Sequence, residues 1–397
     1  MPANAAIQTP SYRIRSIDLL RGLVMVIMAL DHVRDLLNHD AFLYNPLDAS
    51  KTTPVLYLTR WITHFCAPTF VMLSGTSAYL VGLRKGKQEL SRFLLTRGLW
   101  LIFVDFTIMS LAFSFTPKLI GFSVLAVMGS GMILLSLMVY LPERIIPVMG
   151  LILIFFHNTL DGIQFAPGST AQIIWSLLHA PGAAQFGNIT FLIAYPLIPW
   201  VGLVMAGYGL GMLFRPEFDP ARRTRLLRFM GLSAIFLFIV LRYINVYGDP
   251  LRWEPGATAV QTLMSFFNVL KYPPSLLFLL VTLGPVLLML SWLQTASISS
   301  ENPLVLLGRV PLFYFVVHFQ IIHIIAIAVA VGMGHPLGVM LTHNFILDTP
   351  KIIDNYGLTL PWIYAIWILL VLALYPVCRR YAKYKENHRE QWWLSYL

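Results

Sequence analysis

Residues 274–294 read PSLLFLLVTLGPVLLMLSWLQ, a run without any acidic or basic side chain. As an α-helix, about 20 apolar residues span the roughly 30 Å hydrocarbon core of a lipid bilayer. Gly284 and Pro285 lie inside the run, and helices in membrane bundles tolerate both residues. The stretch therefore predicts a transmembrane helix.

The composition of the whole chain agrees with this interpretation. Of its 397 residues, 57% are hydrophobic and only 12% are charged, and the mean hydropathy is +0.72. Soluble domains carry about 25% charged residues, so lipid is the expected solvent. We predict an all-α integral membrane bundle in the lipid bilayer, with a single domain over 1–397, a cytoplasmic N-terminus at 1–16 and a cytoplasmic C-terminal tail at 379–397.

Further apolar stretches recur along the chain and predict about ten transmembrane helices in total. They lie at 17–37, 56–82, 97–116, 119–141, 145–160, 189–213, 229–247, 274–294, 309–332 and 360–378. Cytoplasmic loops carry an excess of Lys and Arg. With a cytoplasmic N-terminus, all but eight of the 28 Lys and Arg residues fall inside; those eight are Arg34, Lys51, Arg60, Lys118, Arg242, Arg252, Lys271 and Lys351. The bias predicts that both termini are cytoplasmic.

The net charge of +10 is explained by these orientation charges, and no nucleic-acid motif accompanies it. Cys66 and Cys378 are distant in sequence and form neither a disulfide framework nor a zinc spacing. We therefore expect no nucleic-acid partner and no metal. The longer outer loops at 39–55, 161–188 and 248–273 are candidates for function, as is the loop at 333–359.

The first predicted span carries ionisable residues near both of its ends. Asp18 and Arg21 stand near the start, and Asp31 and His32 near the end. Such residues are expensive inside a membrane and are functional candidates. Eleven residues at 3.6 per turn return to the same helix face, so Arg21 and His32 share one face about 16 Å apart. Asp18 can pair with Arg21, and Asp31 could orient the imidazole of His32.

This arrangement suits group transfer from a charged donor. The guanidinium of Arg21 can hold the phosphates of a nucleotide-based donor such as acyl-CoA. The imidazole of His32 can accept a proton from an attacking hydroxyl or amine, or can take the acyl group itself. In the alternative interpretation, Arg21 snorkels to the lipid head groups and His32 merely ends a helix in the outer interface. The spacing alone leaves both interpretations open.

The same residues resemble a known family. Arg21, ten residues and His32 resemble the arginine–histidine motif of the acyltransferase-3-like transmembrane acyltransferase superfamily. The block SIDLLRGLVMVIM (16–28) is similar to the first helix of the heparan-alpha-glucosaminide N-acetyltransferase catalytic domain and its bacterial relatives. WITHFCAPTFVMLSG (61–75) continues the similarity, as do the shorter blocks at 195–200, 271–275 and 308–314. The resemblance implies a membrane acetyltransferase of the bacterial cytoplasmic (inner) membrane.

The resemblance leaves the identity of the catalytic histidine open. The animal lysosomal enzymes have Asn where this chain has His32, and their catalytic His lies further on, in the first luminal segment. His39 is nearer to that position, although its surroundings do not match. His64 lies in the second span at a depth similar to that of His32 and could line the same cavity. We predict a catalytic set of His32, Asp31 and His64, with Arg21 and Asp18 binding the donor.

Two other polar groups are less specific. His318 follows Tyr314 by four residues, so both lie on one helix face and predict a hydrogen-bonded core pair. The segment 271–274, which contains Lys271, opens the eighth span at the outer surface. It either shapes the entrance for an acceptor or forms an ordinary helix-starting turn.

The predicted reaction moves an acyl group, expected to be acetyl, from cytoplasmic acetyl-CoA or another acyl-CoA. The acceptor is a hydroxyl or amine of an extracytoplasmic glycan or lipid-linked sugar. The alternative is a proton-coupled transporter that uses Arg21, His32 and Asp105, because a carboxylate in mid-membrane needs a partner or a proton. Arg97 lies nearly on the same side of the helix as Asp105 and is its candidate ion-pair partner. The residues do not decide between covalent and direct transfer, nor whether the chain forms a homo-oligomer.

Overall fold

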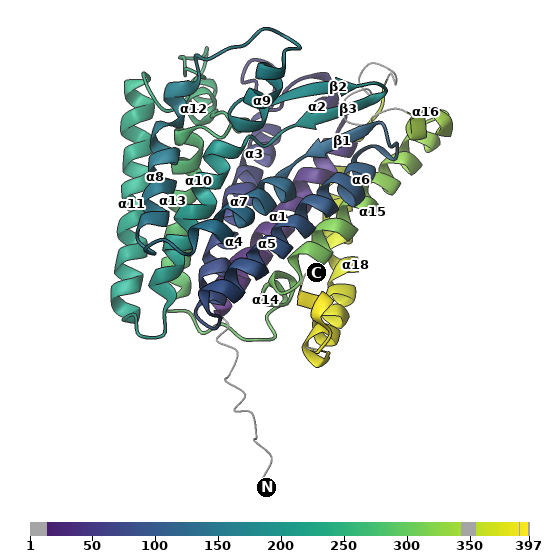
Figure 1. Ribbon diagram of the computed structural model, residues 1–397. Coiled ribbons are helices and arrows are strands. Elements are labelled where there is room, and N and C mark those ends of the chain that lie inside the picture. Colours follow the sequence, from purple (N-terminus) through teal and green to yellow (C-terminus); the bar gives the residue numbers. More distant parts are fainter. Residues whose placement is uncertain (1–13, 343–354, 389, 396–397) are drawn as a thin grey trace.

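The computed structural model describes residues 14–342, 355–388 and 390–395, and it is predominantly helical (Figure 1). Within these residues, seven helical segments are long and apolar enough to cross a membrane. They are Pro54–Gly82, Lys87–Ser114, Leu197–Phe214, Pro220–Ile244, Leu276–Leu293, Pro311–Gly332 and Leu360–Asn387. The predicted all-α membrane bundle is confirmed. Most of the predicted N-terminal segment 1–16 and part of the loop 333–359 lie outside the described residues.

The remaining predicted spans also contain helices, but one of these carries several charges and two are short. The helix α1 (Arg15–Leu37) carries six acidic or basic side chains, three of each sign. The helices α7 (Val124–Met138) and α8 (Ile145–Phe156) are apolar but shorter. A helix therefore lies in every predicted span, whereas the number ten for those that cross the membrane stays a prediction. The predicted tail at 379–397 begins inside α18 (Leu360–Asn387), which continues as helix to Asn387.

The other helical elements are α2 (His39–Leu43), α3 (Pro54–Ile62), α4 (Cys66–Gly82), α5 (Lys87–Val104), α6 (Ser110–Ser114), α9 (Thr170–Leu178), α10 (Leu197–Gly211), α11 (Pro220–Ile244), α12 (Ala259–Phe267), α13 (Leu276–Leu293), α14 (Pro303–Gly308), α15 (Pro311–Gly332) and α16 (Leu337–Thr342). Short 3₁₀ turns lie at Thr63–Phe65, His157–Leu160, Met212–Phe214 and Trp392–Ser395, and a π-helical turn lies at Asp105–Met109.

A small sheet departs from the predicted helices. Its order is β1-β3-β2, with β1 (Leu119–Phe122) parallel to β3 (Ile189–Ile193) and β2 (Gly182–Phe186) antiparallel to β3. In Figure 1 the sheet, α2, α9 and α12 lie together at the upper end of the bundle. The spans predicted at 119–141 and 189–213 thus begin as strands. The sequence did not reveal this, because periodicity cannot separate a short apolar strand from a buried helical segment.

The helix α1 lies in the centre of the bundle and contacts α4, α13, α14, α15 and α18. Two glycines bring its backbone close to α14. A Cβ added at Gly22 would lie 1.8 Å from the carbonyl oxygen of Leu304, and a Cβ added at Gly308 would lie 1.9 Å from that of Asp18. Both positions therefore require glycine, since small residues are what lets helices in membranes approach closely.

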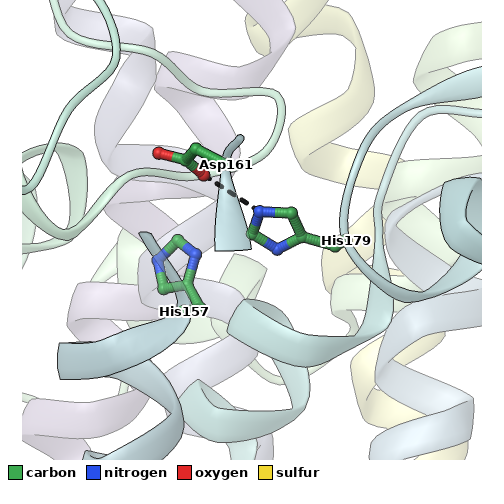
Figure 2. Close-up of side chains that lie close together, drawn as sticks. All are labelled: His157, Asp161 and His179. Atoms are coloured by element: carbon green, nitrogen blue, oxygen red, sulfur yellow. Dashed lines mark hydrogen bonds and ion pairs between the residues drawn. The ribbon is translucent and has the colours of Figure 1, made fainter. Parts of the chain in front are cut away.

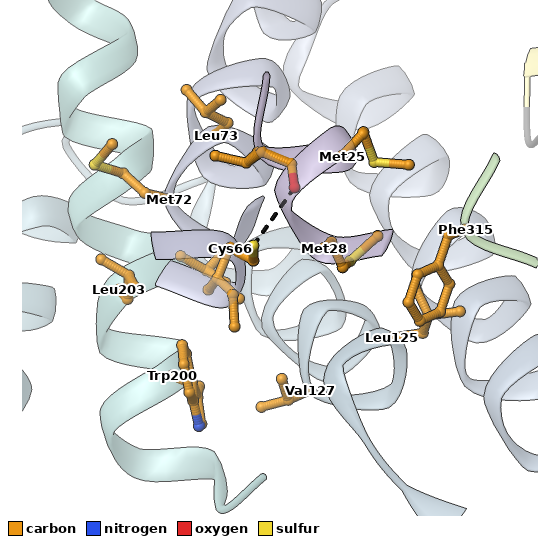
Figure 3. Packing of buried hydrophobic residues seen from close by; sticks show 14 of the residues in the cluster. Met25, Met28, Cys66, Met72, Leu73, Leu125, Val127, Trp200, Leu203 and Phe315 are labelled. Atoms are coloured by element: carbon orange, nitrogen blue, oxygen red, sulfur yellow. Dashed lines mark hydrogen bonds between the residues drawn. The ribbon is translucent and has the colours of Figure 1, made fainter. Parts of the chain in front are cut away.

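Figure 3 shows the apolar packing around this centre. Met25 and Met28 of α1 belong to one buried cluster with Cys66 and Leu73 of the second span and with Trp200 of α10. The thiol of Cys66 donates to the carbonyl oxygen of Val24 at 3.4 Å. Both Cys66 and Cys378 are free thiols, in agreement with the expectation that they form no disulfide.

Candidate functional site

A cavity of about 600 Å³ lies beside α1 inside the bundle. Arg21 lines one end and His32 lines the other, so the face that the two residues share on α1 is also the wall of the cavity. Between them the wall is apolar and includes Met25, Met28 and Phe315. A molecule that occupied the cavity would therefore meet a guanidinium, an apolar stretch and an imidazole in that order.

The sheet contributes to the same cavity. Leu119 and Phe122 of β1 and Leu192 of β3 line it, together with Ser123 and Val124 at the start of α7. The strands that interrupt the predicted helices therefore help to form the wall of the site.

The Arg21 end is cationic. Arg21 donates to Asp18 Oδ1 at 3.2 Å and to the carbonyl oxygen of Gly308 at 3.1 Å, and its other terminal nitrogen donates to Ser77 Oγ at 3.1 Å. Asp18 and Arg21 thus form the pair that their spacing suggested. Arg309, directly after Gly308, also lines the cavity, as does Lys385 of α18. These basic groups make this end suited to an anionic ligand.

The His32 end contains a chain of two imidazoles. Nδ1 of His32 lies 2.8 Å from Nε2 of His318, and Nδ1 of His318 lies 2.7 Å from the carbonyl oxygen of Tyr314. A carbonyl oxygen only accepts, so the hydrogen-bond network assigns the proton of His318 to Nδ1. With both rings neutral, Nε2 of His318 accepts and Nδ1 of His32 donates. This tautomer leaves the lone pair of His32 on Nε2, and no hydrogen bond within the described residues uses that atom.

Asp31 is surrounded by cationic side chains rather than by the ring of His32. Its Oδ1 accepts hydrogen bonds from Arg34 at 2.7 Å, from Arg60 at 2.9 Å and from Thr63 Oγ1 at 2.7 Å. The ammonium of Lys271 lies 3.9 Å from Oδ2. The sequence analysis expected Asp31 to orient the ring of His32, but the hydrogen-bond partner of that ring is His318. Asp31 is instead the buried counterion of three cations.

The charges around the His32 end do not cancel. Arg34 also pairs with Asp35. The carboxylates of Asp31 and Asp35 therefore face the three cations named above, and one positive charge remains. Lys271 lines the cavity together with Tyr272 and Tyr195, and the hydroxyls of these two tyrosines lie 3.4 Å apart. This end thus combines an imidazole, an ammonium and phenolic hydroxyls on one wall.

The loop that carries Lys271 is held by a buried carboxylate. Asp249 Oδ2 accepts from the backbone N–H of Leu270 at 2.9 Å and from Ser275 Oγ at 2.6 Å. Burial raises the pKa of Asp249 above its ordinary value, although these hydrogen bonds oppose the shift. The segment 271–274 therefore contributes Lys271 and Tyr272 to the cavity wall and also leads into α13. Its role at an acceptor entrance stays a prediction.

The other two candidate histidines do not line the cavity. His64 is buried, its Nδ1 lies 3.3 Å from the carbonyl oxygen of Arg60, and its ring packs beside Phe278. His39 is partly exposed in α2 and contacts Asp40 at 3.3 Å. The structure therefore brings only His32 of the three to the cavity wall.

Asp105 does not form the predicted ion pair with Arg97. Its carboxylate accepts from the backbone N–H of Ser123 at 2.7 Å, from Ser123 Oγ at 2.6 Å and from the backbone N–H of Ala126 at 3.0 Å. It thereby satisfies the free N–H groups at the N-terminus of α7. Asp105 is buried and is not part of the cavity wall.

His318 and Arg60 are the two most informative of the site residues that the sequence analysis missed. It paired His318 only with Tyr314 and counted Arg60 only as an orientation charge. The signal available was that each is an ionisable residue inside a predicted span, or at its end. That signal could not show that His318 faces His32 or that Arg60 faces Asp31.

A family model described as the catalytic domain of heparan-alpha-glucosaminide N-acetyltransferase matches residues 13–242, which is more than half of the chain. The match includes α1 with Arg21 and His32 and ends within α11. Lys271 and His318 lie beyond the matched residues. A comparison with curated proteins finds no match.

Proposed function

Because the chain belongs to the catalytic-domain family of heparan-alpha-glucosaminide N-acetyltransferase, we propose that it moves an acyl group, expected to be acetyl, from acyl-CoA to a hydroxyl or amine. The acceptor is an extracytoplasmic glycan or lipid-linked sugar. The observation that carries this proposal is the cavity, which has Arg21 at one end and His32 at the other.

The Arg21 end suits the donor. Acyl-CoA carries its phosphates at one end and its thioester at the other, joined by a flexible pantetheine arm. Arg21 and Arg309 offer planar guanidinium groups that match phosphate oxygens, and the ammonium of Lys385 adds positive charge. The apolar wall between the two ends accommodates the arm, so the thioester can reach the imidazole of His32.

The His32 end suits the chemistry. In direct transfer, Nε2 of His32 takes the proton of the acceptor hydroxyl or amine as that group attacks the thioester carbonyl carbon. The carbon–sulfur bond then breaks, and the CoA thiolate receives the proton from the imidazolium. In covalent transfer, Nε2 of His32 attacks the thioester carbon first, the carbon–sulfur bond breaks and the CoA thiolate leaves, so that His32 carries the acyl group. The acceptor then attacks that acyl group and frees the imidazole, and the proton of the acceptor passes to the thiolate. In both routes the ammonium of Lys271 favours the negative charge that develops on the carbonyl oxygen.

The transporter alternative is less well supported. It required Asp105 on the path, and the carboxylate of Asp105 is instead bonded to the N-terminus of α7, away from the cavity wall.

The proposed orientation places the Arg21 end in the cytoplasm of a bacterial inner membrane. The basic segments 84–97 and 215–228 support it because α4 and α10 end close together. Arg215 bonds both to Tyr79, in α4, and to Glu143. Arg21 bonds to Ser77 of the same helix, so these segments share the end of the bundle that contains Arg21. An excess of positive charge marks the cytoplasmic end.

Reporter fusions test this orientation. A reporter placed after Arg92 or Arg225 is expected to show cytoplasmic activity, and one placed after Pro167, between α8 and α9, is expected to show the opposite location. Each reporter would be paired with one that is active only on the other side. A cytoplasmic signal after Pro167 would place the donor and acceptor ends the other way round.

The donor site is tested by Arg21→Lys. This substitution keeps the charge but loses the planar fork that bonds Asp18, Gly308 and Ser77. The purified wild-type protein is expected to bind radiolabelled acetyl-CoA, and Arg21→Lys to bind it several-fold more weakly. Arg15→Lys is the matched control, since Arg15 lies on the same helix and bonds to the carbonyl oxygen of Ile298. Equal affinity in all three proteins would remove Arg21 from the donor site.

A further inference from the structure

Three side chains outside the cavity wall converge near the outer loops, as Figure 2 shows. His157 and Asp161 come from the turn that follows α8, and His179 comes directly after α9. One possible ligand atom from each lies within 4.8 Å of the others. Nε2 of His179 lies 2.9 Å from Oδ1 of Asp161.

The two imidazoles are buried without their full set of partners. Within the described residues, neither ring nitrogen of His157 has a hydrogen-bond partner, and Nδ1 of His179 has none. Both side chains are 2% exposed. Buried polar atoms are normally paired, so a native structure that leaves three unpaired at one place needs a reason. A ligand that accepts one lone pair from each ring would supply part of that reason, because it would give His157 a partner while each neutral imidazole keeps one N–H.

The carboxylate of Asp161 is held in place by a chain of two hydrogen bonds. Asp161 Oδ2 accepts from Asn158 Nδ2 at 2.9 Å, and Asn158 Oδ1 accepts from the backbone N–H of Leu276 at 2.9 Å. Leu276 is the first residue of α13. Asp161 is thus fixed by a residue that is itself fixed to another helix, and hydrogen bonds of this kind orient the side chains that bind a metal.

We propose that His157, Asp161 and His179 bind one divalent transition-metal ion, for which Zn²⁺ is the best match. Zinc takes neutral imidazole nitrogens and carboxylate oxygens at about 2.0–2.2 Å, so two of its ligand atoms lie roughly 3–4 Å apart. The three atoms are already close to that spacing, and small side-chain rotations complete it. The side chain of Asp161 is 23% exposed, which gives the ion a route of entry and leaves a fourth position for water.

This ion fastens the loop between α8 and α9, which precedes the strands that reach the cavity wall. It joins the end of α8 to the residue after α9, and the chain then continues through β2 and β3 to Tyr195 in the cavity wall. The proposed role is structural, because none of the three ligands lines the cavity. It is separate from the proposed reaction, for which no metal is invoked.

The test uses the purified full-length protein in detergent after treatment with a chelator. Wild type is expected to bind one Zn²⁺ per chain by calorimetry, to gain thermal stability on binding, and to give the visible absorption bands of a tetrahedral site with Co²⁺. His157→Ala and His179→Ala are expected to lose all three signals. His39→Ala is the matched control and is expected to keep them, since His39 also contacts a carboxylate, that of Asp40, but belongs to no such three-ligand cluster within the described residues.

Asp161→Asn keeps the size of the side chain and covers the case in which a histidine variant does not fold. It is expected to weaken Zn²⁺ binding at least tenfold. The proposal is overturned if wild type binds no stoichiometric metal, if Asp161→Asn binds with wild-type affinity, or if binding survives in both histidine variants. These readouts do not depend on acyl transfer, so a failure of the proposed function leaves them unchanged.

Discussion

His32→Ala is expected to lower the rate of acyl transfer by about 10²–10⁴-fold, the usual effect of losing a general base, while acetyl-CoA binding stays close to that of wild type. The physical reason is that Arg21 and Arg309 lie at the other end of the cavity and remain intact. Purified variants would be compared for transfer from radiolabelled acetyl-CoA and, separately, for donor binding.

His64→Ala and His39→Ala are the matched controls for this experiment, because neither histidine lines the cavity. Both are expected to retain near wild-type turnover. If His39→Ala is inactive while His32→Ala turns over normally, the pattern of the lysosomal enzymes is the better guide. A covalent route would leave an acyl adduct on His32 when the acceptor is absent, and a general-base route would leave none.

His318 can be tested as the residue that positions His32. His318→Ala removes the acceptor for Nδ1 of His32 and allows the ring to adopt the other tautomer. Transfer is expected to fall by less than in His32→Ala. The pH at which transfer reaches half its maximum is expected to move, which a purely structural role would not require.

Asp31→Asn is expected to have the largest effect on stability. It leaves Arg34, Arg60 and Lys271 without the carboxylate that they share. Removing one partner of a buried ion pair typically costs about 3–5 kcal/mol. The thermal midpoint in detergent and the yield of folded protein are therefore expected to fall sharply, while transfer per folded molecule falls less than in His32→Ala.

Two further variants isolate the charge effect. Asp35→Asn is the matched control, because Asp35 pairs with the same Arg34 but its side chain is 45% exposed; the expected loss is less than about 1 kcal/mol. Adding Arg60→Gln to Asp31→Asn removes one uncompensated cation and is expected to restore part of the lost stability, since residues in one network couple. A wild-type midpoint for Asp31→Asn would show that another group neutralises these cations.

The helices could be located from the sequence because the bilayer imposes a length and a composition on each one. The run at 274–294 predicted α13 with boundaries close to those observed, Leu276–Leu293. The boundaries failed at 119–141 and 189–213, where β1 and β3 precede the helices. Short apolar strands that cover the end of a bundle have the same local composition as a helix end, so hydropathy could not separate them.

What the sequence by itself determined about the site lies within single helices. Arg21 and His32 share a face because α-helical periodicity is a local property, and the Asp18–Arg21 pair spans only one turn. Only the tertiary structure decided which residues of other helices meet that face. His318 is 286 positions away from His32, and Arg60 and Lys271 reach Asp31 from other segments. Such contacts depend on the approach of packed helices, as at Gly22 and Gly308, and no periodicity within one helix specifies that approach.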